Sequence, residues 1–578
     1  MRSHLRRSLI PTILLAVVIG VSVAASPDRL IDDPTNTRVA GIDIDATTIP
    51  QLQQLMNSRR LNSVQLTQFY LRRIRQLNPT LNAVITVSPT ALADARAADA
   101  ARRAGDNRPL LGIPIIVKDN INTTGMATTA GSWALAGSTP DDAFIVQQLR
   151  AAGALIIGKA NLSEWANFRS APSSSGWSGI GGQTNMAYVL DRNPCGSSAG
   201  SGVIVSADLA VAAVGTETDG SIVCPSGANA NAAIKPTLGL LSRAGIIPIS
   251  ADQDTAGPMA RNVTDAAVLL GAMTGVDPND PATTEQAGHA VTDYTPFLDA
   301  NALQGARIGV WREFSFEVGG VPVNADVSAI MADTIAALEA AGATIVDPAN
   351  VPFGDWANVE FPALLCEFKT DIATYLETYT GPGYPKTLQD LIDFNNDNPE
   401  LESGAPASNW NSLLFEFAQA TDGRDANCAA LRAVATAGAR AAIDDLMAAH
   451  NLDAIIAPTN APAWVTDPVN GDLGGDFSTF IGSSSPAAVA GYVNVTVPAG
   501  FIGPLPIGVS FIGGRWDEPR LIGLAYAFEQ ATRVRVPPQF IPTIGGDASA
   551  SRQPGSQGKG KAQKAVVPGR GIWRIPPF

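Results

Sequence analysis

One lysine in this sequence stands where it could act as a base. Lys118 ends an apolar run, 112–117, and a lysine at the end of a buried strand would be desolvated. Burial disfavours the ammonium form and lowers the pKa, which a lysine general base requires. From composition alone, an ion pair with an acid such as Asp119 is the preferred interpretation. Spacing alone does not separate Lys118 from two lysines in similar settings, Lys159 and Lys235.

Two serine clusters follow this lysine. The first, 195–202, is rich in Gly and Ser and leads into an apolar run. Small residues there would let backbone N–H groups and a helix N-terminus approach a bound oxygen. A flexible loop or a phosphate cradle is the alternative, although no lysine follows the glycines as the Walker pattern requires.

The second cluster, 215–222, comes after the apolar run 209–214 and presents Ser221 on a glycine-flanked turn. Such a turn suits a nucleophile whose attack site is surrounded by backbone N–H donors. An ordinary polar turn is the alternative interpretation. Each cluster alone is weak, but the two clusters and the strand-end lysine together favour serine–lysine chemistry.

Histidine and cysteine usage excludes the commoner catalytic units. The chain has three histidines, His4, His289 and His450, and none has site-like neighbours. Its four cysteines show no Cys-x-x-Cys spacing and no close pairing with histidine: Cys195, Cys224, Cys366 and Cys428. A zinc site and a histidine-based triad are therefore not expected. We expect the cysteines to be buried thiols, although a Cys195–Cys224 bridge is conceivable.

The elements that would position these residues alternate between strands and helices. Strands are predicted at 113–117 and 155–157, separated by a helix near 143–152, and again at 454–456, 493–497 and 507–512. Two amphipathic helices are predicted within 51–77, and a final helix at 519–532. Residues 350–450 are predicted to be mostly helical, with no site-like cluster. This alternation indicates an α/β fold with one large sheet.

Four motifs resemble the amidase signature family. They are Gly112-Ile-Pro-Ile-Ile-Val-Lys118-Asp-Asn, Gly196-Ser-Ser198, Gly220-Ser-Ile222 and Lys235-Pro-Thr. The resemblance extends over about residues 45–540 and is greatest to bacterial peptide amidases. It implies a single large α/β domain in which helices flank a central twisted mixed β-sheet.

The resemblance also implies roles for individual residues. Lys118, Ser197 and Ser221 match the Lys, cis-Ser and nucleophilic Ser of the family's triad. The oxyanion hole would be formed by the backbone N–H groups of Thr218, Asp219, Gly220 and Ser221, and no metal or cofactor is implied. Lys159 and Lys235 match motifs that the family does not use as a base.

Three positions depart from the family's usual pattern. Asp219 replaces a glycine, as it also does in peptide amidases, and the small Ala199 replaces another. Asn231 places a polar side chain in a region that the family packs with glycine and valine. Because all three triad positions are retained, these departures bear on local packing more than on chemistry.

By this resemblance the protein hydrolyses carboxamide bonds through an acyl-serine. The expected substrate is a small-molecule or peptide amide, such as a C-terminal peptide amide that releases ammonia. A non-catalytic peptide-binding protein on the same scaffold is the alternative from another class. An esterase or a fatty-acid amide hydrolase is the alternative among enzymes.

Charge and composition limit the partners. The 578 residues are 46% hydrophobic and carry a net charge of −14, so the chain is a well-cored globular protein rather than a disordered one. The acidic excess lies within 26–545 and disfavours nucleic acid.

The two ends of the chain differ in charge and composition from residues 26–545. The basic segment 1–7, the apolar run 9–25 and small residues before Ser26 predict a secretory signal peptide, 1–25, cleaved near Ala25. An uncleaved membrane anchor is the alternative. The expected protein is secreted or periplasmic, without stable membrane insertion. The predicted organisation is completed by an amidase domain, 26–545, and a basic, disordered tail, 546–578. We expect this tail to be a solvated end of the chain rather than a segment that binds acidic surfaces.

Overall fold

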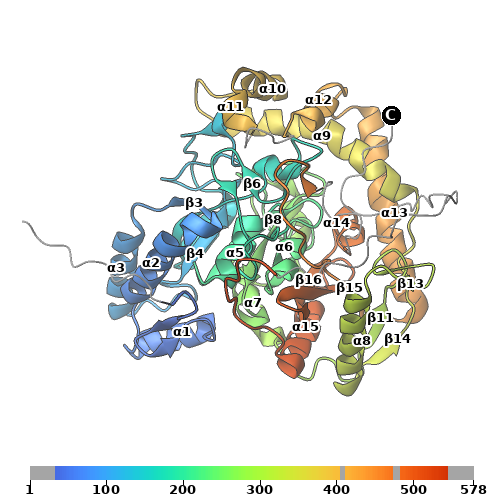
Figure 1. Ribbon diagram of the computed structural model, residues 1–578, viewed down its shortest axis with the longest axis horizontal. Coiled ribbons are helices and arrows are strands. Elements are labelled where there is room, and N and C mark those ends of the chain that lie inside the picture. Colours follow the sequence, from blue (N-terminus) through green and yellow to red (C-terminus); the bar gives the residue numbers. More distant parts are fainter. Residues whose placement is uncertain (1–32, 404–409, 473–481, 545–578) are drawn as a thin grey trace, which may run out of the picture.

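The fold is built on one large mixed sheet, seen in a computed structural model that describes residues 33–403, 410–472 and 482–544 (Figure 1). Eleven strands follow the order β14-β11-β15-β17-β16-β9-β10-β8-β4-β5-β3, and helices flank the sheet. The predicted fold class, a single α/β domain with a central mixed sheet, is confirmed. The predicted signal peptide, 1–25, and tail, 546–578, lie outside the described residues.

The strands of this sheet, in chain order, are β3 Val84–Val87, β4 Pro114–Lys118, β5 Leu155–Ala160, β8 Ala212–Glu217, β9 Ala232–Lys235, β10 Thr255–Ala260, β11 Arg307–Val310, β14 Thr344–Val346, β15 Ala454–Pro458, β16 Asn494–Ile502 and β17 Leu505–Ile512. Three short two-stranded pairs lie apart from it: β1 Arg38–Val39 with β2 Ile42–Asp43, β6 Trp177–Ser178 with β7 Gly182–Gln183, and β12 Glu317–Val318 with β13 Val321–Pro322.

The part of the sheet around β4 and β8 brings the lysine close to the serine clusters. β4 pairs in parallel with both β5 and β8, and every residue of the three strands is buried. Burial on both faces explains why these strands are continuous apolar runs rather than alternating ones. Since Val117 lies opposite Val214, the two strands end at the same edge of the sheet. Lys118, at the end of β4, therefore lies beside the last residues of β8.

The α-helices are α1 Ile49–Asn57, α2 Ser63–Leu81, α3 Ala91–Arg103, α4 Phe144–Ala151, α5 Ala199–Ser206, α6 Val223–Ala228, α7 Val263–Met273, α8 Ala325–Ala340, α9 Asp355–Tyr379, α10 Leu388–Asp397, α11 Pro399–Glu402, α12 Leu413–Gln419, α13 Ala426–His450, α14 Ser485–Ala490 and α15 Glu518–Thr532. The two predicted N-terminal helices are confirmed as α1 and α2. Each begins with a capping box, at Thr48 and Asn62. No described helix combines the length and apolar character needed to span a bilayer.

The prediction that the cysteines are free thiols is wrong. Cys195 is bonded to Cys224, and Cys366 to Cys428, with 6.0 Å between the Cα atoms of each pair. The first bridge is the one that the sequence made conceivable. The second joins α9 to α13, two long helices that pack against each other (Figure 1). Their packing, which brings the two cysteines together, is not visible in the spacing of cysteines along the chain.

Asn231, one of the three departures from the family pattern, is accommodated through a hydrogen bond from its side-chain amide. Its side chain is fully buried, and Nδ2 donates to the carbonyl oxygen of Gly202 in α5 at 2.8 Å. Its neighbour Asn229 donates to the carbonyl oxygens of Pro194 and Pro225. These amides tie the first serine cluster to the segment that follows α6, because buried polar groups need hydrogen-bond partners.

Candidate active site

Lys118 and Ser197 are in direct contact. The Nζ of Lys118 lies 2.8 Å from the Oγ of Ser197, and 2.9 Å from the Oγ1 of Thr216. The lysine is completely buried, and burial lowers its pKa to about 7, although the carboxylates of Asp254 and Glu217 act to raise it. A lysine with this pKa is substantially neutral near neutral pH, as a general base must be.

The ion pair between Lys118 and Asp119, which composition alone preferred, does not form. Asp119 instead pairs with Lys159, whose Nζ lies 3.4 Å from its Oδ1, and accepts a hydrogen bond from Thr129. Lys235 donates to the carbonyl oxygen of Pro236. Of the three lysines that spacing could not separate, Lys118 is the one in contact with a serine of the two clusters.

The first serine cluster is anchored on both sides. The peptide bond between Gly196 and Ser197 is cis. The carbonyl oxygen of Ser197 accepts from the N–H of Ser163 at 3.0 Å, and the Oγ of Ser198 donates to the carbonyl oxygen of Thr216 at 3.0 Å. These bonds hold the Ser197 side chain at the end of β8, beside Lys118.

The turn that carries Ser221 is held by the carboxylate of Glu217. Its Oε2 accepts from the N–H groups of Ile222 at 2.7 Å and Val223 at 3.0 Å, where α6 begins. Gly220 adopts a φ of +77°, the left-handed region that glycine occupies without a steric cost. Within the described residues, no acceptor pairs with the N–H groups of Asp219, Gly220 or Ser221. The turn therefore offers free donors of the kind that an oxyanion hole needs.

The Asp219 side chain connects this turn to α14. Its two carboxylate oxygens accept from the hydroxyls of Ser484 and Ser485, and burial raises its pKa to about 6. Sequence analysis missed both serines. The run Gly482-Ser-Ser-Ser485 resembles the serine clusters and was the available signal.

A second support for the turn comes from the segment predicted to hold no site-like cluster. Gln253 donates to the carbonyl oxygen of Thr218 at 3.0 Å, and Arg432 of α13 donates to Gln253 at 2.7 Å. Arg432 in turn forms two hydrogen bonds with Glu367 of α9. The prediction that 350–450 is mostly helical is confirmed by α9 to α13. The prediction that it holds no site-like cluster is wrong, because α9 and α13 bring Glu367 and Arg432 into the network behind the turn.

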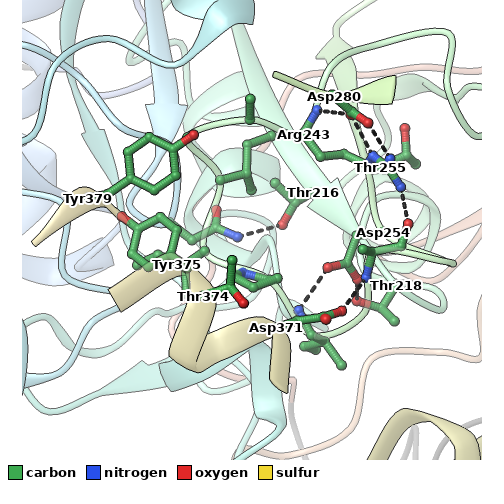
Figure 2. Close-up of a pocket in the computed structure, with 18 of the residues that line it drawn as sticks. Thr216, Thr218, Arg243, Asp254, Thr255, Asp280, Asp371, Thr374, Tyr375 and Tyr379 are labelled. Carbon is green, nitrogen blue, oxygen red and sulfur yellow. Dashed lines mark hydrogen bonds and ion pairs between the residues drawn. The ribbon is translucent and has the colours of Figure 1, made fainter. Parts of the chain in front are cut away.

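A cavity of about 440 Å³ lies beside this arrangement (Figure 2). Thr216 and Thr218 form part of one wall, and Asp371, Tyr375 and Tyr379 of α9 form another. Lys118, Ser197 and Ser221 do not line it. The cavity meets the proposed catalytic groups through Thr216, whose hydroxyl contacts Lys118.

Comparison with known proteins assigns the chain to a family. The sequence profile described as Amidase matches residues 65–522. A probable amidase from Arabidopsis thaliana is 39% identical over 513 residues, which cover 86% of this chain and 92% of that protein. The chain belongs to the amidase signature family and is a hydrolase that acts on amide C–N bonds.

Two solved structures similar to this chain are peptide amidases. The native peptide amidase from Stenotrophomonas maltophilia is 47% identical, with a TM-score of 0.78, over 86% of this chain and 99% of that one. A peptide amidase in complex with the competitive inhibitor chymostatin is also 47% identical, with a TM-score of 0.80, over 85% of this chain and 99% of that one. The predicted resemblance to peptide amidases is confirmed.

Proposed function

We propose that the protein is a secreted serine amidase that hydrolyses carboxamides, including C-terminal peptide amides, and releases ammonia. The observation that carries the proposal is the 2.8 Å contact between a buried lysine of lowered pKa, Lys118, and the hydroxyl of Ser197. Ser197 lies next to Ser198, whose N–H donates to the carbonyl oxygen of Ser221. This backbone contact brings the Ser221 turn next to the Lys118–Ser197 pair, although among the described residues no hydrogen bond joins the hydroxyls of Ser197 and Ser221.

The proposed mechanism is a relay of two proton transfers, one from Ser221 to Ser197 and one from Ser197 to Lys118. Neutral Lys118 accepts a proton from Ser197 while Ser197 accepts one from Ser221, and the Ser221 oxygen attacks the amide carbonyl carbon. The free N–H groups of the turn stabilise the oxyanion, each by about 3–4 kcal/mol in comparable sites. The proton returns through Ser197 to the leaving nitrogen, so ammonia departs and an acyl-serine remains. Water then hydrolyses this ester by the same relay.

The proposed substrate class is supported by the solved relatives. A solved relative of similar fold is a peptide amidase in complex with the competitive inhibitor chymostatin. We therefore place peptide amides first among the substrates of this chain.

The proposed location is the cell exterior or periplasm. The predicted signal peptide supports export, and two disulfides are typical of oxidising compartments.

Ammonia release from a panel of peptide amides, acyl amides and esters tests the proposal. We expect release from peptide amides by the wild-type protein, and at least a thousandfold less by a folded Ser221→Ala variant. A fluorophosphonate should label wild-type Ser221 and not the variant. Hydrolysis of esters alone would favour the esterase alternative, and peptide binding without labelling or turnover would favour the binding protein. Full activity in Ser221→Ala would overturn the assignment of the nucleophile.

A further inference from the structure

The peptide unit that joins Thr218 to Asp219 is anchored at both of its ends. The Oγ1 of Thr218 donates to the Oδ1 of Asp254 at 2.5 Å. The carboxylate of Asp219 accepts from the hydroxyls of Ser484 and Ser485. Because a peptide unit is rigid and planar, the main movement left to it is a rotation of its plane about the line between the two Cα atoms.

Gln253 fixes this rotation. Its Nε2 donates to the carbonyl oxygen of Thr218 at 3.0 Å, and its side chain is only 1% exposed. The peptide bond is trans, so the carbonyl group of Thr218 and the N–H of Asp219 point in opposite directions. A hydrogen bond to the carbonyl oxygen therefore also sets the direction of this N–H, which has no acceptor among the described residues.

The orientation of the Gln253 amide is determined by its neighbours. The Nη1 of Arg432 lies 2.7 Å from the Oε1 of Gln253, and since a guanidinium can only donate, that oxygen is the acceptor. The Nε2 is then left to face the carbonyl oxygen of Thr218 and the Oε1 of Glu360, which lies 2.7 Å away. Glu367 accepts two hydrogen bonds from Arg432 and holds the guanidinium in place. A flipped amide would bring its oxygen against the carbonyl oxygen of Thr218 and leave Arg432 facing a donor.

We propose that Gln253 is a positioning residue that directs the N–H of Asp219 toward the oxyanion of the reaction by holding the carbonyl oxygen of Thr218. This inference rests on the proposed function, because it concerns the oxyanion hole of the Ser221 turn. Donors that are already oriented stabilise an oxyanion best, since they need not reorganise as its charge develops. Without Gln253 the peptide plane could rotate, and this donor would have to be reoriented in each turnover.

Gln253→Met tests the proposal, because it keeps the length of the side chain and removes its donors. We expect kcat for a peptide amide to fall at least tenfold while KM changes less than threefold, since the oxyanion forms only in the transition state. A second variant, Gln253→Glu, keeps the acceptor for Arg432 and has no donor when ionised. Its kcat should fall at least as far.

The matched control is Gln286→Met. Gln286 is also buried, and its Nε2 donates to the carbonyl oxygens of Gly239 and Gly275, away from the Ser221 turn. Denaturant unfolding should show similar losses of stability for Gln286→Met and Gln253→Met. The control should nevertheless keep at least half of the wild-type kcat.

A transition-state analogue separates positioning from general structural support. The carbonyl carbon of a peptide aldehyde can be attacked by the hydroxyl of Ser221, which places the aldehyde oxygen in the oxyanion hole, whereas the corresponding peptide alcohol forms no such adduct. In Gln253→Met, the Ki of the aldehyde should rise by about the factor by which kcat/KM falls. The Ki of the alcohol should stay the same.

A wild-type kcat in folded Gln253→Met, or an equal loss of kcat in Gln286→Met, would overturn the proposal. A loss that appears only in KM, or an unchanged Ki for the aldehyde, would do the same. A wild-type protein that neither releases ammonia from amides nor is labelled at Ser221 would instead overturn the proposed function, and this inference with it.

Discussion

The backbone N–H of Ser198 donates to the carbonyl oxygen of Ser221 at 3.2 Å, so the two serine clusters are joined directly. The Oγ of Ser198 also donates to Thr216, the residue whose hydroxyl contacts Lys118. A displacement of either loop would therefore change how the two proposed catalytic serines lie relative to Lys118. The predictions below test the parts that hold this unit in place.

Activity should depend on the protonation of Lys118. Since burial lowers its pKa to about 7, kcat/KM should rise about tenfold per pH unit well below 7 and level off above it. Activity should rise rather than fall with increasing pH, because only the neutral amine of Lys118 can accept the proton of Ser197. A pH series with a peptide amide measures this profile, and activity that stays constant into acid pH would contradict a lysine base. Lys118→Met, which keeps the length and removes the amine, should lose about 10²–10⁴-fold in kcat.

Glu217→Leu should reduce both stability and activity. It removes the acceptor for the N–H groups of Ile222 and Val223, at a cost of about 2–3 kcal/mol in the free energy of unfolding. Because these bonds hold the Ser221 turn, kcat should fall at least tenfold. Glu518→Leu is the matched control, since Glu518 is a buried acceptor for the N–H of Thr237. Denaturant unfolding should show a similar loss for both, and an equal loss of kcat would show that Glu217 has no special role.

Gly220→Ala should impair the turn itself. At a φ of +77° an added Cβ costs about 1–2 kcal/mol, and it would lie 3.0 Å from the Oγ of Ser484. We expect kcat to fall at least tenfold as the donors of the turn move. Gly305→Ala has nearly the same φ, +76°, with nothing within 4 Å, and so separates backbone strain from the contact. Comparable kcat in the two folded variants would refute this role for Gly220.

Loss of the two disulfides should have different effects on catalysis. Each bridge closes a loop, over 29 and 62 residues, so removal of either should lower the free energy of unfolding by about 3–5 kcal/mol. Cys195 and Cys224 flank the two proposed catalytic serines, so Cys195→Ala/Cys224→Ala should also reduce kcat. The comparison variant is Cys366→Ala/Cys428→Ala, which removes the bridge between α9 and α13.

Thermal unfolding and kcat, measured well below both transitions, separate these effects. The Cys366–Cys428 variant should retain at least half of the wild-type kcat, and the Cys195–Cys224 variant less than a tenth. A Cys195–Cys224 variant with full kcat would show that hydrogen bonds alone position the serines.

The sequence by itself determined the fold class, and it was sufficient to predict Lys118, Ser197 and Ser221 as candidate catalytic residues. Lys118 ends an apolar strand, Ser221 lies on the turn after another, and Ser197 lies in a Gly/Ser motif just before an apolar helix. Such local patterns are visible without knowledge of packing. The resemblance to one family then supplied an order of motifs that spacing alone did not rank. Burial of Lys118 could be expected from the sequence, since the four residues of β4 that precede it are apolar.

Only the tertiary structure decided which groups meet across the chain. It paired Asp119 with Lys159 rather than Lys118, bonded the cysteines, and placed Arg432 behind the carbonyl of Thr218 through Gln253. The cavity under α9 likewise joins strand ends to a helix far along the chain. These contacts depend on how helices pack over the sheet, which is set by the summed burial of many side chains. Residue spacing records the period of a single element, and it carries no information on which distant element will cover it.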